Sequence, residues 1–240
     1  MLLRAIETAT EVVGAALVSH EGPVAVFQVS RGRRHAETLA PGIELLLHHA
    51  AARVEDLTAI AVDVGPGLFT GMRVGLATAK AMAHALDLPI VPVNSLEVLS
   101  AAVRDHGSAG SGRVVAVLDA RRGEVFWASF RVDGSGRLHP CTPPVAAEPA
   151  DLLGELLLVD EPMLLVGDAA LGLRELLAGG LRGVTFAAAR HALPDVAVLA
   201  ELATAALARG EVTDVAGLQP MYLRAPDAEI NWRVRDGGAR

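Results

Sequence analysis

The sequence is poor in cysteine, lysine and aromatic residues, and it lacks a long uninterrupted hydrophobic run. Its single cysteine, Cys141, cannot form an intramolecular disulfide. The seventh residue is already an acid, Glu7, so we expect no signal-peptide core at the start of the chain. Every apolar stretch is interrupted before the roughly 18–20 residues that a membrane-spanning helix needs. These absences predict a protein of the reducing cytoplasm with no membrane partner.

Basic residues are also few for a protein that binds nucleic acid. Lys and Arg total 21 against 28 Asp and Glu, which gives a net charge of −7, and Lys80 is the only lysine. Because nucleic-acid binding depends on neutralising phosphates, this balance disfavours tRNA binding by the chain alone. Apolar residues, by contrast, make up 52% of the 240 residues. A chain of this length and apolar content can bury a substantial core in one large or two compact domains.

The first part of the chain alternates strands and helices. Three strands come first, with a turn signal at residues 20–23, and are expected to be antiparallel. The βαβ order that follows is typical of a mixed sheet flanked by helices. The predicted elements are strands over 2–6, 12–18 and 24–29, a helix over 40–54 with Pro41 in its first turn, a strand over 59–64, a helix over 72–86, a strand over 90–93 and a helix over 95–104.

A Gly- and Ser-rich segment at 105–112 predicts a linker between a lobe over 1–106 and a lobe over 112–240. The second lobe partly repeats the first, because a strand over 114–118 ends in Asp119 as the first strand of the chain ends in Glu7. Further strands are predicted over 124–132 and 163–166, helices near 173–177 and over 195–208, and a polar tail after Pro226. We therefore predict an α/β protein with two lobes built on one plan.

The helix predicted over 72–86 is apolar on most of its surface. One seam contains Met72, Leu76, Ala79, Ala83 and Leu86, and a second contains Val74, Ala77, Ala81 and Ala85. A helix of this composition must be covered on more than one side. Either it is wholly buried in its own lobe, or a partner helix packs on its small residues.

The loop Gly65–Gly71 lies between a strand and a helix N-terminus, where phosphate-binding loops are found. It lacks the Gly-Lys-Ser/Thr ending of a P-loop, its third glycine comes one residue late for a dinucleotide-binding loop, and Pro66 stiffens it. These departures favour a structural turn. The histidines and Cys141 form no cluster with zinc-ligand spacing, and no nucleophile elbow of the Gly-x-Ser-x-Gly type is present, so we predict neither a metal site nor protease chemistry.

Residues 7–10, Glu-Thr-Ala-Thr, resemble the Asp-x-Gly-Thr phosphate loop of the actin, sugar-kinase and heat-shock ATPase superfamily (ASKHA), which has a duplicated two-lobed fold. Glu7 replaces the aspartate and Ala9 the glycine, so the resemblance implies a degenerate site in a fold with a shortened second lobe. The candidate phosphate-contacting residues are Glu7, Thr8, Gly65, Gly67, Thr70 and Gly71. In such a cleft Asp119, Glu124 and Asp168, otherwise interpreted as turn and strand-end residues, would also be candidates.

A narrower resemblance covers nearly the whole chain in order. It rests on the segments 7–10, 34–41 (Arg-His-Ala-Glu-Thr-Leu-Ala-Pro), 65–75 (Gly-Pro-Gly-Leu-Phe-Thr-Gly-Met-Arg-Val-Gly), 119–126 (Asp-Ala-Arg-Arg-Gly-Glu-Val-Phe), 166–168 (Val-Gly-Asp) and 220–224 (Pro-Met-Tyr-Leu-Arg). Together they resemble the bacterial TsaB (YeaZ) family, in which serine is usual at Leu68 and aspartate at Glu7.

The resemblance implies a noncatalytic subunit of the machinery that makes N6-threonylcarbamoyladenosine beside the tRNA anticodon. In that family TsaB pairs with its catalytic paralogue TsaD, the ATPase TsaE joins them, and TsaC-type enzymes supply threonylcarbamoyl-adenylate. TsaD carries two metal-ligating histidines, at whose places this chain has Ser95 and Leu99. We therefore expect no metal, no required cofactor, ATP or ADP at most at a complex interface, and tRNA contact only through the complex.

The helices near 36–53 and 72–86 are the predicted docking surface for a TsaD-like subunit, and for a homodimer when that subunit is absent. The candidate interface residues are His35, Leu39, Met72, Val74, Gly75, Thr78, Ala81 and Met82. His35 is expected to have a capping or contact role at the start of the first helix. The alternative function is an independent nucleotide-dependent kinase or ATPase of the same fold, which the two-lobe plan supports and Ala9 and Pro66 oppose.

Overall fold

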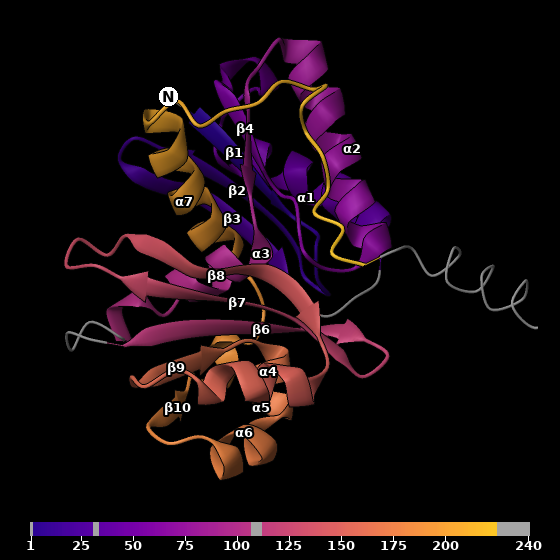
Figure 1. Cartoon of the computed structure of the whole chain (residues 1–240). Helices are drawn as coiled ribbons and strands as arrows, with labels where there is room; N and C mark the ends of the chain where they lie inside the picture. The colour runs from indigo at the N-terminus through magenta and orange to yellow at the C-terminus, as the bar shows by residue number, and fades with distance from the viewer. Residues whose placement is uncertain (1, 31–33, 107–111, 225–240) are drawn as a thin grey trace, which may run out of the picture.

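The chain forms two five-stranded mixed sheets in a computed structural model that describes residues 2–30, 34–106 and 112–224 (Figure 1). The first sheet has the order β3-β2-β1-β4-β5, from β1 (Leu2–Glu7), β2 (Val13–Ser19), β3 (Gly22–Val29), β4 (Ala59–Asp63) and β5 (Ile90–Val93). The second has the order β8-β7-β6-β9-β10, from β6 (Arg113–Arg121), β7 (Glu124–Val132), β8 (Leu138–Ala147), β9 (Met163–Val166) and β10 (Val184–Phe186).

The two sheets repeat one pairing scheme. In each, the first strand pairs antiparallel with the second and parallel with the fourth, and the second pairs antiparallel with the third. Glu7 ends β1, and Asp119 lies close to the end of β6, at the corresponding strand. The predicted duplication is confirmed, and the chain has the two-lobed ASKHA fold.

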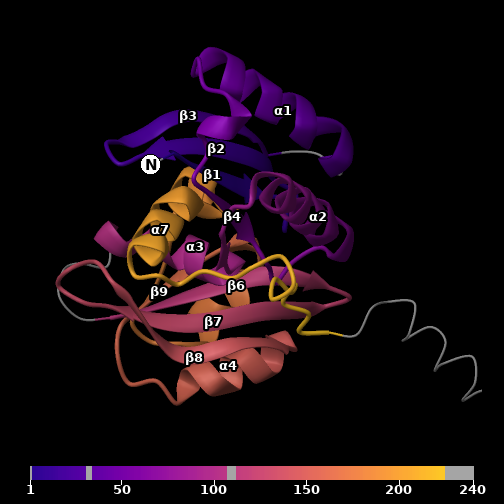
Figure 2. The same cartoon turned by 90° about the horizontal axis from the view of Figure 1, so that it is seen from above.

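Helices cover both faces of both sheets (Figure 2). On the outer face of the first sheet lie α1 (His35–His49) and α2 (Phe69–Leu86), and on the outer face of the second lie α4 (Pro149–Leu157), α5 (Asp168–Gly172) and α6 (Arg174–Gly180). Between the sheets lie α3 (Ser95–Ala101) and α7 (Val196–Ala208). Single 3₁₀ turns occur at Val54–Asp56, Arg104–His106 and Ala189–His191.

The two inner helices are exchanged between the lobes. From the second half of the chain, α7 packs Leu199 and Ala200 against Leu3 and Ala5 of the first sheet. From the first half, α3 packs on β6 and β7 of the second sheet. The predicted boundary at 106–112 therefore separates the sheets along the chain but does not separate the lobes in space. From sequence order, each helix was expected to pack on the sheet formed by its own half of the chain. In the structure, each packs on the sheet formed by the other half.

Some elements differ from their predicted bounds. The first helix starts at His35, five residues earlier than expected, and therefore contains Pro41 in its interior and not in its first turn. Four elements were not predicted from the sequence, namely β8, β10, α4 and α5. Of these, β8 includes three prolines, at positions 140, 143 and 144. As an edge strand of its sheet, β8 tolerates residues that cannot donate a backbone hydrogen bond.

After α7 the chain continues along the first lobe and then reaches the second. Thr213 pairs with Ile90 at the edge of the first sheet, and the Met221 amide donates to the Val64 carbonyl at 2.8 Å. Arg224 then forms an ion pair with Glu124 of the second sheet at 2.8 Å. Residues 213–224 thus connect the two lobes, and we call them the C-terminal strap. The polar tail predicted after Pro226 lies outside the described residues.

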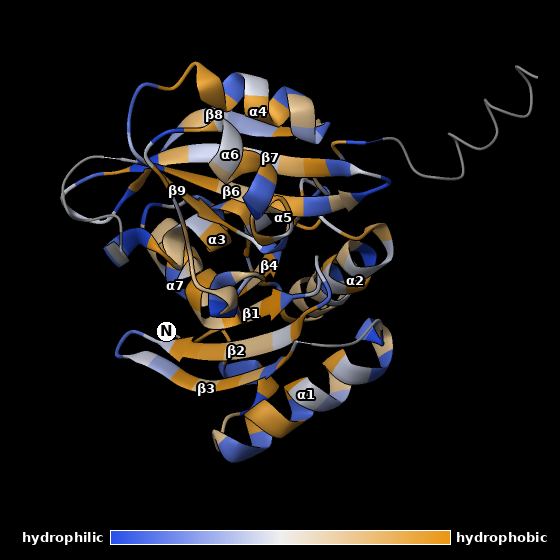
Figure 3. Ribbon diagram, turned by 90° about the horizontal axis from the view of Figure 1, so that it is seen from below, coloured by the Kyte–Doolittle hydropathy of each residue, from blue (hydrophilic) through white to orange (hydrophobic). Residues whose placement is uncertain are grey.

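Apolar residues are concentrated along the strands, whereas apolar and polar residues alternate along the outer helices (Figure 3). Four buried apolar clusters, one on each face of each sheet, account for the high apolar content of the sequence. In the described ranges no helix combines the length and hydrophobicity needed to cross a bilayer.

Candidate functional site

The candidate phosphate-contacting residues meet at the carboxyl ends of β1 and β4. Glu7 and Asp63 end these neighbouring parallel strands, and both are completely buried. Glu7 Oε1 accepts the backbone amides of Ala9 at 2.9 Å and Thr10 at 3.4 Å. Asp63 Oδ1 accepts the Gly65 amide at 2.7 Å and the hydroxyl of Ser95 at 2.8 Å. The two carboxyl groups thereby fix the turns that follow the two strands.

The two buried carboxyl groups affect each other's ionisation. Burial raises the pKa of Glu7 well above its ordinary value, and the neighbouring Asp63 raises it further. Burial also raises the pKa of Asp63, but hydrogen bonds from Glu7, Gly65 and Ser95 oppose that rise. Glu7 Oε2 and Asp63 Oδ2 meet no other donor in the described part of the chain. The raised pKa of Glu7 favours its protonated form, which can donate a hydrogen bond to the Asp63 carboxylate.

The loop Gly65–Gly71 packs directly on the turn that follows β1. The Leu68 amide donates to the Ala9 carbonyl at 2.6 Å, and the Thr8 hydroxyl donates to the Gly71 carbonyl at 2.8 Å. A Cβ at Gly67 would lie 2.0 Å from the Ala9 oxygen. The two candidate segments therefore lie against each other, and the hydrogen bonds between them use backbone groups that a phosphate loop would offer to its ligand. Thr70 alone among the six candidates is exposed.

The cleft between the lobes at this site is nearly closed. Its cavity measures about 20 Å³ and is lined by residues of both lobes, among them Ala9, Leu68 and Asp168. Glu11 and Arg121 bridge the lobes with an ion pair at 2.8 Å. Ligand pockets for small molecules are usually about 300–1,000 Å³. A nucleotide does not fit the cleft in this conformation.

Ser95 and Leu99, which stand at the places of the metal-ligating histidines of TsaD, are both completely buried. Ser95 binds Asp63, as described, and Leu99 belongs to the core on the inner face of the second sheet. Nowhere in the ranges 2–30, 34–106 and 112–224 do three His, Cys, Asp or Glu side chains gather as a metal site. The residues present therefore do not fit a metal of the kind that the resemblance assigns to TsaD.

The predicted interface residues divide into two groups. His35, Leu39, Met72 and Gly75 face the core of the first lobe, and the His35 ring nitrogen Nε2 lies 2.8 Å from the Thr10 carbonyl oxygen. This contact connects the first residue of α1 with the turn that follows β1. These four residues are buried and not available at the surface, so fewer of the predicted interface residues can contact a partner. Val74, Thr78 and Met82 are half-buried, and Ala81 is exposed.

The face of α2 away from the sheet is open in the single chain. We call it the outer α2 face and define it by Val74, Ala77, Thr78, Ala81, Met82 and Ala85. The interpretation of α2 as wholly buried in its own lobe is therefore wrong. Its neighbour α1 covers β2 and β3, so α1 and α2 lie side by side on the outside of the first lobe (Figure 2). Sequence periodicity identified this apolar helix but could not say which seam faces the sheet.

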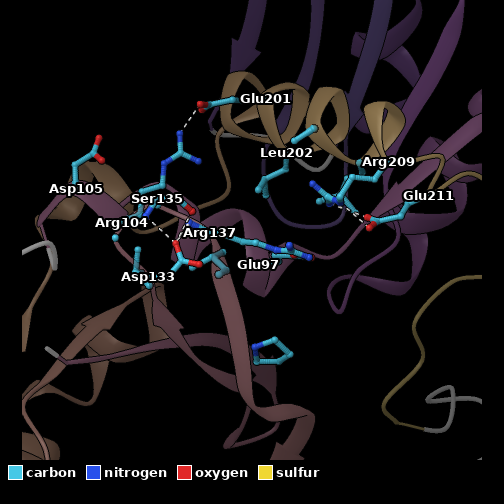
Figure 4. A pocket seen from close by; sticks show the side chains of 18 of the residues that line it. Glu97, Arg104, Asp105, Asp133, Ser135, Arg137, Glu201, Leu202, Arg209 and Glu211 are labelled. Atoms are coloured by element: carbon cyan, nitrogen blue, oxygen red, sulfur yellow. Dashed lines mark hydrogen bonds and ion pairs between the residues drawn. The ribbon is translucent and has the colours of Figure 1, made fainter. Parts of the chain in front are cut away.

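A larger cavity of about 1,000 Å³ opens between α7 and the β7–β8 hairpin (Figure 4). Its lining is charged. Arg209 pairs with Glu211 at 2.6 Å, and Arg104 pairs with Glu201. Burial raises the pKa of Glu97 there, and the charge of Glu211 adds to the rise. Sequence reasoning selected none of these residues, because they come from separate elements without a common motif.

The chain is similar to known proteins along nearly its whole length. The family model for TsaD, described as tRNA N6-adenosine threonylcarbamoyltransferase, matches residues 29–232. The tRNA threonylcarbamoyladenosine biosynthesis protein TsaB of Bacillus subtilis is 32% identical over 97% of this chain and 98% of its own length. The TsaB protein of Escherichia coli is 29% identical over 99% of both chains.

Two solved structures from Pseudomonas aeruginosa share the architecture. A protein described as similar to the peptidase YeaZ superposes with a TM-score of 0.78 at 27% identity, and covers 93% of this chain and 99% of its own. The YeaZ protein superposes with a TM-score of 0.77 at 28% identity, and covers 92% of this chain and 99% of its own. Both likenesses extend over the two lobes.

Proposed function

Because this chain belongs to the TsaB (YeaZ) family, we propose that it serves tRNA threonylcarbamoyladenosine biosynthesis as a noncatalytic cytoplasmic subunit. It binds a TsaD-like catalytic subunit and stabilises or activates it for transfer of the threonylcarbamoyl group to the adenosine beside the anticodon. A TsaE-like ATPase joins this complex, and tRNA is contacted through the complex.

The closed cleft carries the noncatalytic part of the proposal. The two loops that would hold a phosphate are joined by the Leu68–Ala9 and Thr8–Gly71 hydrogen bonds, and the cleft keeps only about 20 Å³. Opening it would require breaking these bonds and the Glu11–Arg121 ion pair. This packing supports a scaffold in preference to an independent kinase or ATPase. Any ATP or ADP would be held at an interface with the partner, and the chain itself requires no cofactor.

The outer α2 face carries the binding part of the proposal. Its small side chains allow a partner helix to approach closely, and their burial would be favourable because water now covers them. The same face supports a homodimer when the catalytic subunit is absent. A shared surface implies that the two assemblies compete.

The test is association with the catalytic subunit, measured by size-exclusion chromatography with light scattering. The wild-type chain should co-elute as a complex, and Ala81→Glu should abolish co-elution by placing a charge in the contact. Ala178→Glu, on the exposed surface of α6 in the second lobe, is the matched control and should bind normally. Gly75→Arg is unsuitable, because even a Cβ there lies 2.3 Å from the Thr8 hydroxyl. Normal binding by Ala81→Glu would contradict the proposed surface.

A further inference from the structure

Arg4 is a cation in the middle of an apolar layer. It lies on β1 with no exposed surface, and its register partners on β2 and β4 are Leu17 and Ile60. Its Nη1 contacts the sulfur of Met82 on α2 at 3.2 Å. Buried arginines are normally paired with a carboxylate or several carbonyl oxygens, because desolvating a charge is costly.

The expected counter-charge is missing from the described chain. Arg4 Nε and Nη2 have no hydrogen-bond partner in residues 2–30, 34–106 and 112–224. Burial lowers the pKa of Arg4 to about 10, and no acidic neighbour opposes that change. The guanidinium is therefore still charged at neutral pH. Within the described residues its hydrogen-bond partner is the Met82 thioether, which is a weak acceptor.

The position of Arg4 connects it with the outer α2 face. Met82, which covers the guanidinium, is a half-buried member of that face, and the adjacent Ala81 and Ala85 are exposed. A methionine side chain is unbranched and flexible, so it can turn outward over these small neighbours. If Met82 turned outward, Nη1 of Arg4 would lose its thioether contact, and the guanidinium would become accessible from the side of α2.

From this geometry we infer that Arg4 is the receptor for a carboxylate side chain that the catalytic subunit inserts beside Met82. The inference rests on the proposed function, because it assigns the chemistry of one contact within the proposed complex. A buried bidentate arginine–carboxylate pair would fix the register of the two chains as well as their affinity.

The test compares Arg4→Met with the wild-type chain by isothermal titration of the catalytic subunit. Because Arg4→Met removes an unpaired buried charge, the isolated variant should fold and unfold at a higher temperature than the wild type. Its affinity for the catalytic subunit should nevertheless fall at least tenfold, and Arg4→Lys should restore part of it. Arg182→Met, an exposed arginine on the second lobe, is the matched control for charge and should change neither quantity.

A second measurement reports on the guanidinium directly. In the complex, the Nε–H signal of Arg4 in nitrogen-15 NMR should shift and exchange more slowly with water than in the free chain. Unchanged affinity of Arg4→Met, or an unchanged Nε–H signal in the complex, would overturn the inference and leave the proposed function intact. The same signal change produced by free acetate or by homodimerisation alone would also overturn it. A wild-type chain that does not bind the catalytic subunit would overturn both.

Discussion

Glu7 stands where the family usually has aspartate, and burial together with the neighbouring Asp63 raises the pKa of its carboxyl group. In the unfolded chain Glu7 titrates near 4.5, whereas in the folded chain it keeps its proton to a much higher pH. The folded state therefore binds more protons than the unfolded state above pH 4.5, so the free energy of unfolding falls as pH rises through that interval. Loss of the proton would leave two adjacent buried carboxylates.

Glu7→Gln should remove much of this pH dependence. The amide can still donate to Asp63 and accept the Ala9 amide, but it does not titrate. We expect the free energy of unfolding of the wild type to fall by up to about 1.4 kcal/mol per pH unit above the ordinary carboxyl range, until Glu7 ionises. The variant should show a flatter profile in urea unfolding between about pH 5 and 9. Parallel profiles would show that the pair is not protonated.

The Gly65–Gly71 loop requires glycine where its backbone packs against the turn that follows β1. At Gly71, in the first turn of α2, a Cβ would lie 2.1 Å from the Thr8 carbonyl oxygen, which is backbone and cannot move aside easily. Gly71→Ala should therefore cost about 1–3 kcal/mol or more of folding stability. Gly154→Ala is the matched control in α4, where a Cβ meets nothing within 4 Å, and it should stabilise the fold by about 0.5–1 kcal/mol. Similar effects of the two substitutions on chemical denaturation would contradict the close packing of the loop.

The sequence was sufficient to locate the candidate site, but not to show that its two loops bind each other. The segments at Glu7 and at Gly65–Gly71 each follow a buried strand, so their meeting at one sheet edge was predictable from strand order. That the loops bind each other depends on distances of about 3 Å between backbone atoms, which no residue pattern encodes. The burial of Arg4 could not be predicted from the sequence, because an isolated arginine in a strand usually lies at an exposed position.

At the scale of elements, the exchange of α3 and α7 is the main difference from the sequence-based expectation. Strand order and duplication could be read along the chain, because each strand is apolar and ends at a turn. The place of a helix depends on which sheet face remains uncovered, and that is a property of the three-dimensional arrangement. Leu3 and Ala5 need α7, which lies almost two hundred residues later in the sequence.

A fragment of residues 1–106 should consequently fail to fold. Without α7 the inner face of the first sheet, including Leu3 and Ala5, would be exposed to water. Proton–nitrogen NMR of the fragment should show the narrow dispersion of an unfolded chain, or the fragment should aggregate. The full chain under the same conditions is the control. A well-dispersed spectrum from the fragment would support the boundary at 106–112 as a boundary between independent domains.

At the scale of the whole molecule, the apolar content of 52% and the charge of −7 describe two different regions. Most apolar residues fill the four clusters on the sheet faces, and the outer α2 face adds a small uncovered remainder. The acidic balance makes the chain a poor partner for tRNA by itself. Both the uncovered apolar face and the acidic charge are expected of the proposed subunit, which binds another protein and contacts tRNA through it.

The most direct test of this account is reconstitution of the transfer reaction, with N6-threonylcarbamoyladenosine in tRNA as the measured product. The reaction contains threonylcarbamoyl-adenylate, tRNA, the TsaE-like ATPase and the TsaD-like subunit, with or without this chain. We predict product when both subunits are present, much less without this chain, and none from this chain alone. Product formed by this chain without the TsaD-like subunit, or an equal rate in its absence, would contradict the account.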